Sequence, residues 1–211
     1  QGDDHPTRDA LIAATLALLE TLHPEELTLD KILVASGVSK GSLYHQFSEL
    51  NALIDEALLL DFGRGVYADI AAITHLTNRA QSKLELAQGL RLVTQISQDP
   101  DLKHRRLRRV SLILRAQLDP VFSQKLIEIQ RELSDALTQL IRQAQDKKWM
   151  SRTFSPPAAA ALVQAYSLGR LVSQIDGEEL PPQEWNQMIN TIIEQGLMGL
   201  PVGALIDDSA D

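Results

Sequence analysis

The chain has 211 residues, of which 44% are hydrophobic, and this is enough to bury one large core or two smaller ones. It carries 28 acidic and 20 basic side chains, for a formal net charge of −8, which excludes a strongly cationic clamp on nucleic acid. The lack of cysteine excludes disulfides, thiolate zinc sites and a cysteine nucleophile. No apolar run is long enough for a membrane helix, so we expect a cytoplasmic protein with no membrane partner.

The charges are distributed unevenly along the sequence. Residues 1–53 hold three basic and eight acidic side chains, whereas residues 102–148 hold eleven and five. The histidines form no pair at helical spacing, so we expect no metal site. The sequence also contains no Gly-rich phosphate loop and no nucleophile elbow, and we therefore expect neither a cofactor nor enzymatic activity.

Apolar residues recur with a helical period in nearly every long segment, and the sequence therefore predicts an all-α fold of about nine helices. The first helix is expected over residues 7–22 and ends at a His-Pro pair. Two short helices follow within residues 29–47, and a fourth begins after a capping Ser48 and continues toward Ile73. The later helices, several of them started by proline, are predicted over residues 81–97, 101–117, 120–148, 156–175 and 182–200.

The segment 29–47 has the pattern of a helix-turn-helix. Gly37 can adopt the positive φ that the corner needs, Thr28 is a suitable N-cap for the first helix, and Ser39 is one for the second. Leu43 and Phe47 are four residues apart and therefore share one face of that helix. The opposite face holds side chains that can bond phosphates or base edges, with a glycine that allows close approach. The alternative is an ordinary helical hairpin in which Tyr44 and Phe47 are core aromatics.

The run from Gly37 to Phe47, G-V-S-K-G-S-L-Y-H-Q-F, resembles the recognition-helix signature of the TetR family of bacterial transcriptional regulators. The resemblance extends over residues 7–59. It implies a three-helix DNA-binding domain over residues 1–53 that shares a helix with a larger effector-binding and dimerisation domain over residues 54–211. It also implies which residues contact DNA: Thr28, Ser39, Lys40, Gly41, Ser42, Tyr44, His45 and Gln46.

The chain departs from the family pattern at three places. The family usually has a phosphate-binding lysine at the start of the fourth helix, where this chain has Leu50 preceded by Glu49. A small alanine of the second helix is replaced by Leu33, and residues 23–26 replace a typical glycine in the turn before Thr28. These departures predict an intact fold with altered phosphate affinity.

The C-terminal half resembles the family's partner-binding domain more weakly. In the family the last two helices pair with their symmetry mates in a dimer. The residues agree with this, because one helix carries a wide apolar stripe and the other a ridge of small side chains. The predicted homodimer interface consists of Ala161, Ala165, Gly169, Trp185, Met188, Ile189, Ile192 and Gly196. The alternative is that both helices bury these faces within one subunit.

A basic run over residues 103–109 has three interpretations: ion pairs with the acidic N-terminal unit, contact with an anionic effector, or direct DNA binding. A helical wheel places Arg105 and Arg115 away from the apolar face and Arg106 and Gln117 on it. Aromatic side chains nearby can line a pocket or belong to the core. The candidate ligand-binding residues are Arg106, Gln117, Phe122, Trp149 and Tyr166.

The sequence and the resemblance together predict a homodimeric, ligand-responsive transcriptional repressor. An unknown small-molecule effector is expected to release it from a palindromic operator in double-stranded DNA. The alternative is a helical small-molecule-binding or adaptor protein with a weakened DNA-binding unit. The acidic N-terminal region and Leu50 motivate that alternative.

Overall fold

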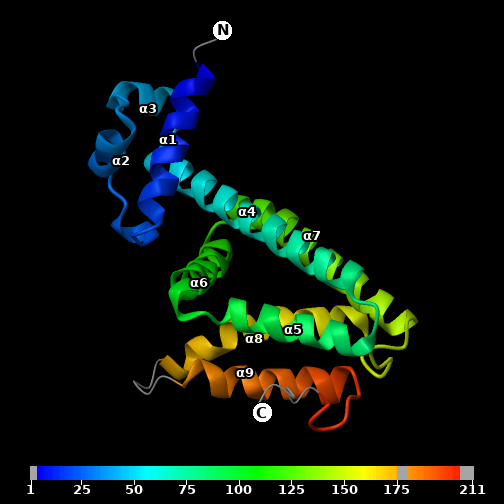
Figure 1. Cartoon of the computed structure of the whole chain (residues 1–211). Coiled ribbons are helices and arrows are strands. Elements are labelled where there is room, and N and C mark those ends of the chain that lie inside the picture. The colour runs from blue at the N-terminus through cyan, green and yellow to red at the C-terminus, as the bar shows by residue number, and fades with distance from the viewer. Residues whose placement is uncertain (1–3, 175–179, 205–211) are drawn as a thin grey trace. The chain divides into compact units, whose positions relative to one another are not determined.

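The computed structural model describes residues 4–174 and 180–204, and the regular structure of these residues is helical throughout (Figure 1). The predicted all-α fold is therefore confirmed. The chain divides into two compact units. The first contains the residues up to Gly65 together with Leu112–Ile129, and the second contains Val66–Ser111 and the residues from Gln130 onward. No described helix is both long and apolar enough to cross a membrane.

This division differs from the boundary that the sequence predicted after residue 53. Helix α4 (Leu50–Arg79) runs without interruption through that position and past Gly65. The first unit also includes the end of α6 (Lys103–Leu118) and the start of α7 (Pro120–Asp146). Three helices therefore contribute residues to both units, because the apolar side chains of their first-unit portions pack into one cluster.

Helices α1 (Asp4–Leu19), α2 (Leu29–Ser36) and α3 (Lys40–Gln46) pack together at the N-terminal end of the first unit (Figure 1). Gly37 follows α2 with a φ of 67°, as the predicted corner requires. The Thr28 hydroxyl accepts a hydrogen bond from the Lys31 backbone N–H at 3.4 Å, and the Ser39 hydroxyl accepts one from Ser42 at 3.1 Å. The helix-turn-helix and both of its caps are therefore confirmed.

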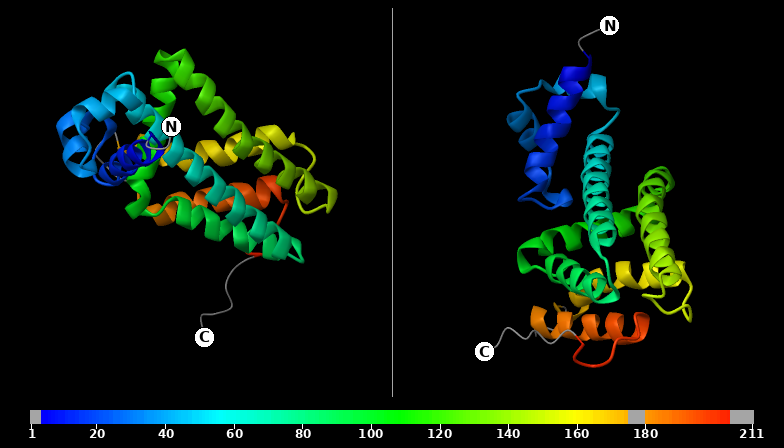
Figure 2. Two further views of the ribbon diagram at one scale, coloured as in Figure 1. Left: turned by 90° about the horizontal axis from the view of Figure 1, so that it is seen from above. Right: turned by 45° about the vertical axis from the view of Figure 1, so that its right-hand side comes forward.

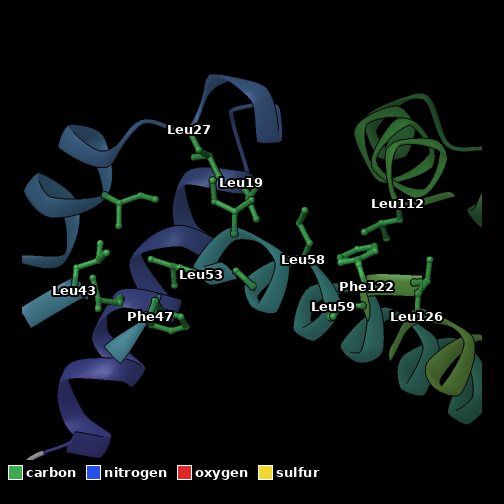
Figure 3. Packing of buried hydrophobic residues seen from close by; sticks show 14 residues of the cluster. Leu19, Leu27, Leu43, Phe47, Leu53, Leu58, Leu59, Leu112, Phe122 and Leu126 are labelled. Carbon is green, nitrogen blue, oxygen red and sulfur yellow. The ribbon is translucent and has the colours of Figure 1, made fainter. Parts of the chain in front are cut away.

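A hydrophobic cluster holds the first unit together, and Figure 3 shows how its side chains converge. Leu43 of α3 and Phe47, the C-cap residue that follows this helix, are both buried in the cluster, as their spacing predicted. Tyr44 is 46% exposed, so the alternative in which it is a core aromatic is wrong. The cluster also includes Leu11, Leu19, Leu27, Ile32, Leu53, Ile54, Ala57, Leu58, Leu59, Leu112, Phe122 and Leu126.

The second unit contains α5 (Lys83–Ser97), α8 (Pro156–Gly169) and α9 (Pro182–Thr191), and α9 lies alongside α5 (Figure 2). The predicted proline starts of α7, α8 and α9 are confirmed. The helix expected over residues 156–175 ends earlier, at Gly169, and continues as a 3₁₀ segment over Arg170–Gln174; Ile175 lies outside the described residues. The helix expected over residues 182–200 becomes a π-helix over Ile192–Leu197.

The segment that follows α8 is held by hydrogen bonds from Arg170. The side chain of Arg170 is 2% exposed, and its guanidinium donates to the carbonyl of Gln98 at 3.1 Å and to that of Leu180 at 3.2 Å. These bonds tie the chain after α8 to the end of α5. Because buried carbonyl groups need donors, the guanidinium stabilises this change of direction.

Replacing Phe122 tests whether it belongs to the first unit's core. Phe122 is 2% exposed, whereas its neighbour Val121 is 69% exposed. We expect Phe122→Ala to lower the free energy of unfolding by about 3–5 kcal/mol, because it leaves a cavity in the cluster. Val121→Ala is the matched control and should change it by less than about 0.5 kcal/mol. Equal effects in chemical denaturation would contradict this placement of Phe122.

Candidate nucleic-acid interface and ligand cavity

The outer face of α3 carries most of the residues that the sequence assigned to DNA contact. Lys40, Gly41, Tyr44 and His45 are exposed, and Ser42 and Gln46 are half-buried. Ser39 caps this helix, whereas Thr28 caps α2. The face therefore presents an ammonium, an imidazole, a phenol and hydroxyl groups, which are the groups that contact phosphates and base edges.

Gly41 leaves a bare stretch of backbone on this face. A Cβ atom at Gly41 would meet nothing closer than the Ser39 hydroxyl at 3.9 Å, which is ordinary van der Waals contact. Packing within the first unit therefore does not require a glycine here, although glycine is unfavourable in a helix. The missing side chain instead allows a flat or grooved surface to approach the helix backbone.

Arg8 of α1 fixes the end of α3, and sequence reasoning missed it. Its guanidinium donates to the backbone carbonyl of Gln46 at 3.4 Å and to the carboxylate of Glu56 on α4, and it lies 4.5 Å from the centre of the Phe47 ring. One side chain therefore joins three helices. Its partners are 38 and 48 residues away in sequence, so no local pattern indicates them.

The charges near α3 are few. The Lys31 ammonium donates to the backbone carbonyl of Glu26 at 2.8 Å, and it is therefore tied to the turn before α2. Lys40 supplies the ammonium of α3 itself. Leu50 and Leu33, which replace the usual lysine and alanine of the family, are partly buried against the hydrophobic cluster. These two departures therefore contribute to packing, and they add no charge to the surface.

The residues predicted to bind a ligand do not line one common cavity. Phe122 belongs to the first unit's core. Gln117 of the same unit is exposed, as are Ile113, Leu114 and Leu118 of the apolar face to which the helical wheel assigned it. In the second unit, the ammonium of Lys147 lies over the ring of Trp149, 4.4 Å from the centre of the ring. The aromatic residues of this set were ambiguous because core packing and pocket lining require the same side chains.

Arg106 is buried, as its place on the apolar face predicted, and it donates hydrogen bonds to backbone groups. Its guanidinium donates to the carbonyls of Ser97 at 2.9 Å and Asp99 at 3.0 Å, which holds the turn between α5 and α6. Tyr166 is the remaining candidate, and it does line a cavity. Its hydroxyl lies 3.2 Å from that of Thr94, and burial raises the pKa of the phenol.

The cavity of the second unit has two adjoining chambers. The inner chamber has a volume of about 50 Å³ and apolar walls from α4, α5, α7, α8 and the π-helix. The outer chamber has a volume of about 180 Å³. It adds charged and polar groups to the wall: Asp69, Arg105, Arg109, Gln164 and Ser167. Arg105, which the helical wheel placed away from the apolar face, is therefore at the edge of a cavity.

Arg109 is held in a polar network at the outer chamber. Its guanidinium donates to the amide oxygens of Gln130 at 3.2 Å and Gln164 at 3.4 Å. Burial lowers the pKa of this guanidinium, and the negative charge of Asp69 on α4 opposes the shift. The basic run over residues 103–109 therefore has an acidic neighbour, Asp69, within the second unit itself. Arg115, at the far end of α6, instead forms an ion pair with Asp55 within the first unit.

The predicted dimer residues fall into two groups. Trp185 lies against Gly169, where an added Cβ atom would be 3.1 Å from its ring, so α8 and α9 pack on each other at this point. Ile189 is buried within the second unit. The other predicted residues are exposed: Ala161, Ala165, Met188, Ile192 and Gly196.

No family model matches the sequence, and no curated protein matches it. Solved structures do match over most of the chain. GusR of Salmonella enterica is 22% identical, with 92% of this chain and 96% of that chain covered and a TM-score of 0.64. The TetR-family transcriptional regulator of Cytophaga hutchinsonii is 16% identical, with coverages of 94% and 98% and a TM-score of 0.69. A Mesorhizobium loti protein assigned to the TetR family is 17% identical, with coverages of 92% and 96% and a TM-score of 0.68.

The described residues thus form an all-helical protein with an N-terminal helix-turn-helix unit and a second helical unit that contains a cavity. Its fold is that of the TetR-family transcriptional regulators. The resemblance seen in residues 7–59 therefore extends to the fold of nearly the whole chain.

Gly41→Ala should weaken duplex binding without lowering thermal stability. We expect the melting temperature to stay the same or rise, because alanine is the better helix former by up to about 1 kcal/mol. Duplex binding should weaken, because the added methyl group prevents close approach. Gly37→Ala is the opposite control: its positive φ predicts a stability loss of about 1–2 kcal/mol. Unchanged duplex affinity in Gly41→Ala would show that this surface does not approach DNA.

Arg8→Gln should weaken duplex binding more than it lowers stability. Arg8 and Glu56 are each about one-third exposed, so their ion pair contributes less than about 1 kcal/mol to folding. Losing it, however, frees the C-terminal end of α3. The neighbouring Asp9→Asn is the control, because Asp9 is exposed. Gel-shift titrations at fixed salt provide the measurement, and equal affinities of the two variants would refute a positioning role for Arg8.

Proposed function

We propose that the chain is a TetR-family transcriptional repressor that binds double-stranded DNA through α3. One observation carries the proposal: the inner side of α3 is buried in the first unit's core, while its outer side is polar and includes the bare backbone of Gly41. A helix of this kind enters the major groove and contacts base edges with its outer residues. The residues proposed to contact DNA are the eight that the sequence predicted.

The proposed repressor acts as a homodimer. Supporting this, the second unit leaves large apolar side chains exposed on its last helices, where Leu162 is 42%, Met188 49% and Ile192 44% exposed. A second copy that covers them would remove apolar area from water, which stabilises association. Two-fold symmetry then requires a roughly palindromic operator with half-sites about 34–36 Å apart.

The proposed repressor also responds to a small molecule bound in the cavity of the second unit. Arg109, at the outer chamber, and Arg115, paired with Asp55 in the first unit, are carried by the same helix, α6. A ligand that favours one position of this helix can therefore change the position of α4, which begins directly after the helix-turn-helix. By linkage, a ligand that prefers the form unable to bind DNA must lower the affinity for DNA.

Lys40→Ala tests the DNA contact through its salt dependence. We expect the slope of log affinity against log salt concentration to fall by about one, because one phosphate contact is lost. Lys148→Ala is a charge-matched control in the second unit, exposed and distant from α3 in sequence, and it should leave the slope unchanged. The assay uses the whole chain with duplexes from upstream of its own gene and with random duplex.

The alternative function is a ligand-binding or adaptor protein with a weakened DNA-binding unit. Leu50 and Glu49 favour it, because they occupy the place where the family has a phosphate-binding lysine. The same titrations distinguish the two functions. A lack of binding to either duplex at low salt would refute the repressor and support the alternative.

A further inference from the structure

The two chambers of the second unit's cavity differ in the chemistry of their walls. The inner chamber is lined almost wholly by hydrocarbon, whereas the outer one also has two guanidinium groups and a carboxylate. The chambers adjoin because five residues line both of them: Ile73, Val93, Leu137, Val163 and Tyr166. A ligand that extends through both chambers must therefore be apolar at one end and polar at the other.

The chamber volumes limit the size of the apolar part. A hydrocarbon-lined cavity of about 150 Å³ stays free of water and binds benzene. The outer chamber, at about 180 Å³, has a similar volume, so it accommodates one aromatic ring or a short branched hydrocarbon. The inner chamber, at about 50 Å³, accommodates a small alkyl group. The Tyr166 hydroxyl is already engaged with Thr94, so it gives the inner chamber little polar character.

The charges at the outer chamber favour a negative ligand group. Arg105 and Arg109 together carry two positive charges, and Asp69 carries one negative charge. Gln130 and Gln164, which are neutral, accept hydrogen bonds from Arg109, and the negative charge of Asp69 also acts on it. An anion that enters therefore meets a net positive wall with an oriented guanidinium, the group that binds carboxylates best. A cationic group is repelled by the same wall.

We propose that this cavity binds a compact organic monoanion, with its carboxylate or equivalent group at Arg105 and Arg109. Its ring-sized hydrocarbon body fills the outer chamber, and a small alkyl tip enters the inner one. This inference rests on the proposed role of the second unit's cavity as the effector site. It adds the chemical class of the effector, which the fold does not specify.

Calorimetric titration of the whole chain with four matched probes tests the proposal. The probes are para-ethylbenzoate, its neutral amide, the cationic para-ethylbenzylamine, and benzoate without the ethyl group. We expect para-ethylbenzoate to bind roughly 10- to 100-fold more tightly than the amide, because it gains charge-assisted hydrogen bonds. Benzoate should bind roughly tenfold more weakly than para-ethylbenzoate, because it loses two buried carbon groups. The amine should bind most weakly.

Two substitutions locate the ligand within the cavity. Arg109→Gln should weaken the binding of para-ethylbenzoate roughly 10- to 100-fold and leave the affinity for the amide unchanged. The retained amide affinity shows that the cavity is still folded. Arg109→Lys should restore part of the loss. Ala144 lines only the inner chamber and is buried, so Ala144→Val should remove the advantage of the ethyl group. Arg131→Gln on the exposed side of α7 is the charge control and should change nothing.

Several results would overturn the proposal: amide or amine binding as tightly as the carboxylate, no binding of any probe, or equal losses in Arg109→Gln and Arg131→Gln. The proposed DNA-binding function is measured separately, by gel shift without any probe. If the chain binds duplex but shows no preference for the carboxylate probe, the proposed effector class is wrong and the proposed repressor function is still supported. If the chain prefers the carboxylate probe but binds no duplex, the proposed effector class is supported and the proposed repressor function is refuted.

Discussion

The burial of Leu43 and Phe47 is the interaction on which the helix-turn-helix of the first unit depends. Helix α3 has seven residues, and an isolated helix of that length is not stable in water. Its conformation is therefore imposed from outside, by the hydrophobic cluster on one side, by the corner at Gly37 and by the Ser39 cap. Arg8 completes the arrangement by holding the last carbonyl of the helix. The polar outer face can stay exposed because the buried inner face, the Ser39 cap and Arg8 together hold the helix in place.

The same cluster explains why the two units do not separate at one point of the sequence. Apolar residues of α4, α6 and α7 enter the first unit's core, and later or earlier parts of the same helices form the second unit. In the proposed repressor, a bound ligand can therefore act on helices that also belong to the first unit, because α4 and α6 line the cavity and contribute residues to both units. This is the physical basis for the proposed coupling between effector and DNA.

Local chemistry made much of the fold predictable. The Gly37 corner, the Thr28 and Ser39 caps and the proline starts of α7, α8 and α9 each depend on neighbours a few residues away. Long-range partners were not predictable: Arg8 meets Gln46 and Glu56, and Phe122 joins a core built mostly from the first 60 residues. The helical wheel assigned Gln117 to an apolar face, but it could not show that this face is exposed at Ile113, Leu114 and Leu118, because exposure depends on which neighbours cover it.

The shortness of α3, the proposed recognition helix, also bears on how such a protein diversifies. Its scaffold uses a few positions, namely the glycine corner, the serine cap and two buried side chains. The outer positions contribute little to folding, so substitutions there can accumulate without unfolding the unit. If α3 binds DNA as proposed, its sequence preference can therefore change while the fold of the unit is preserved.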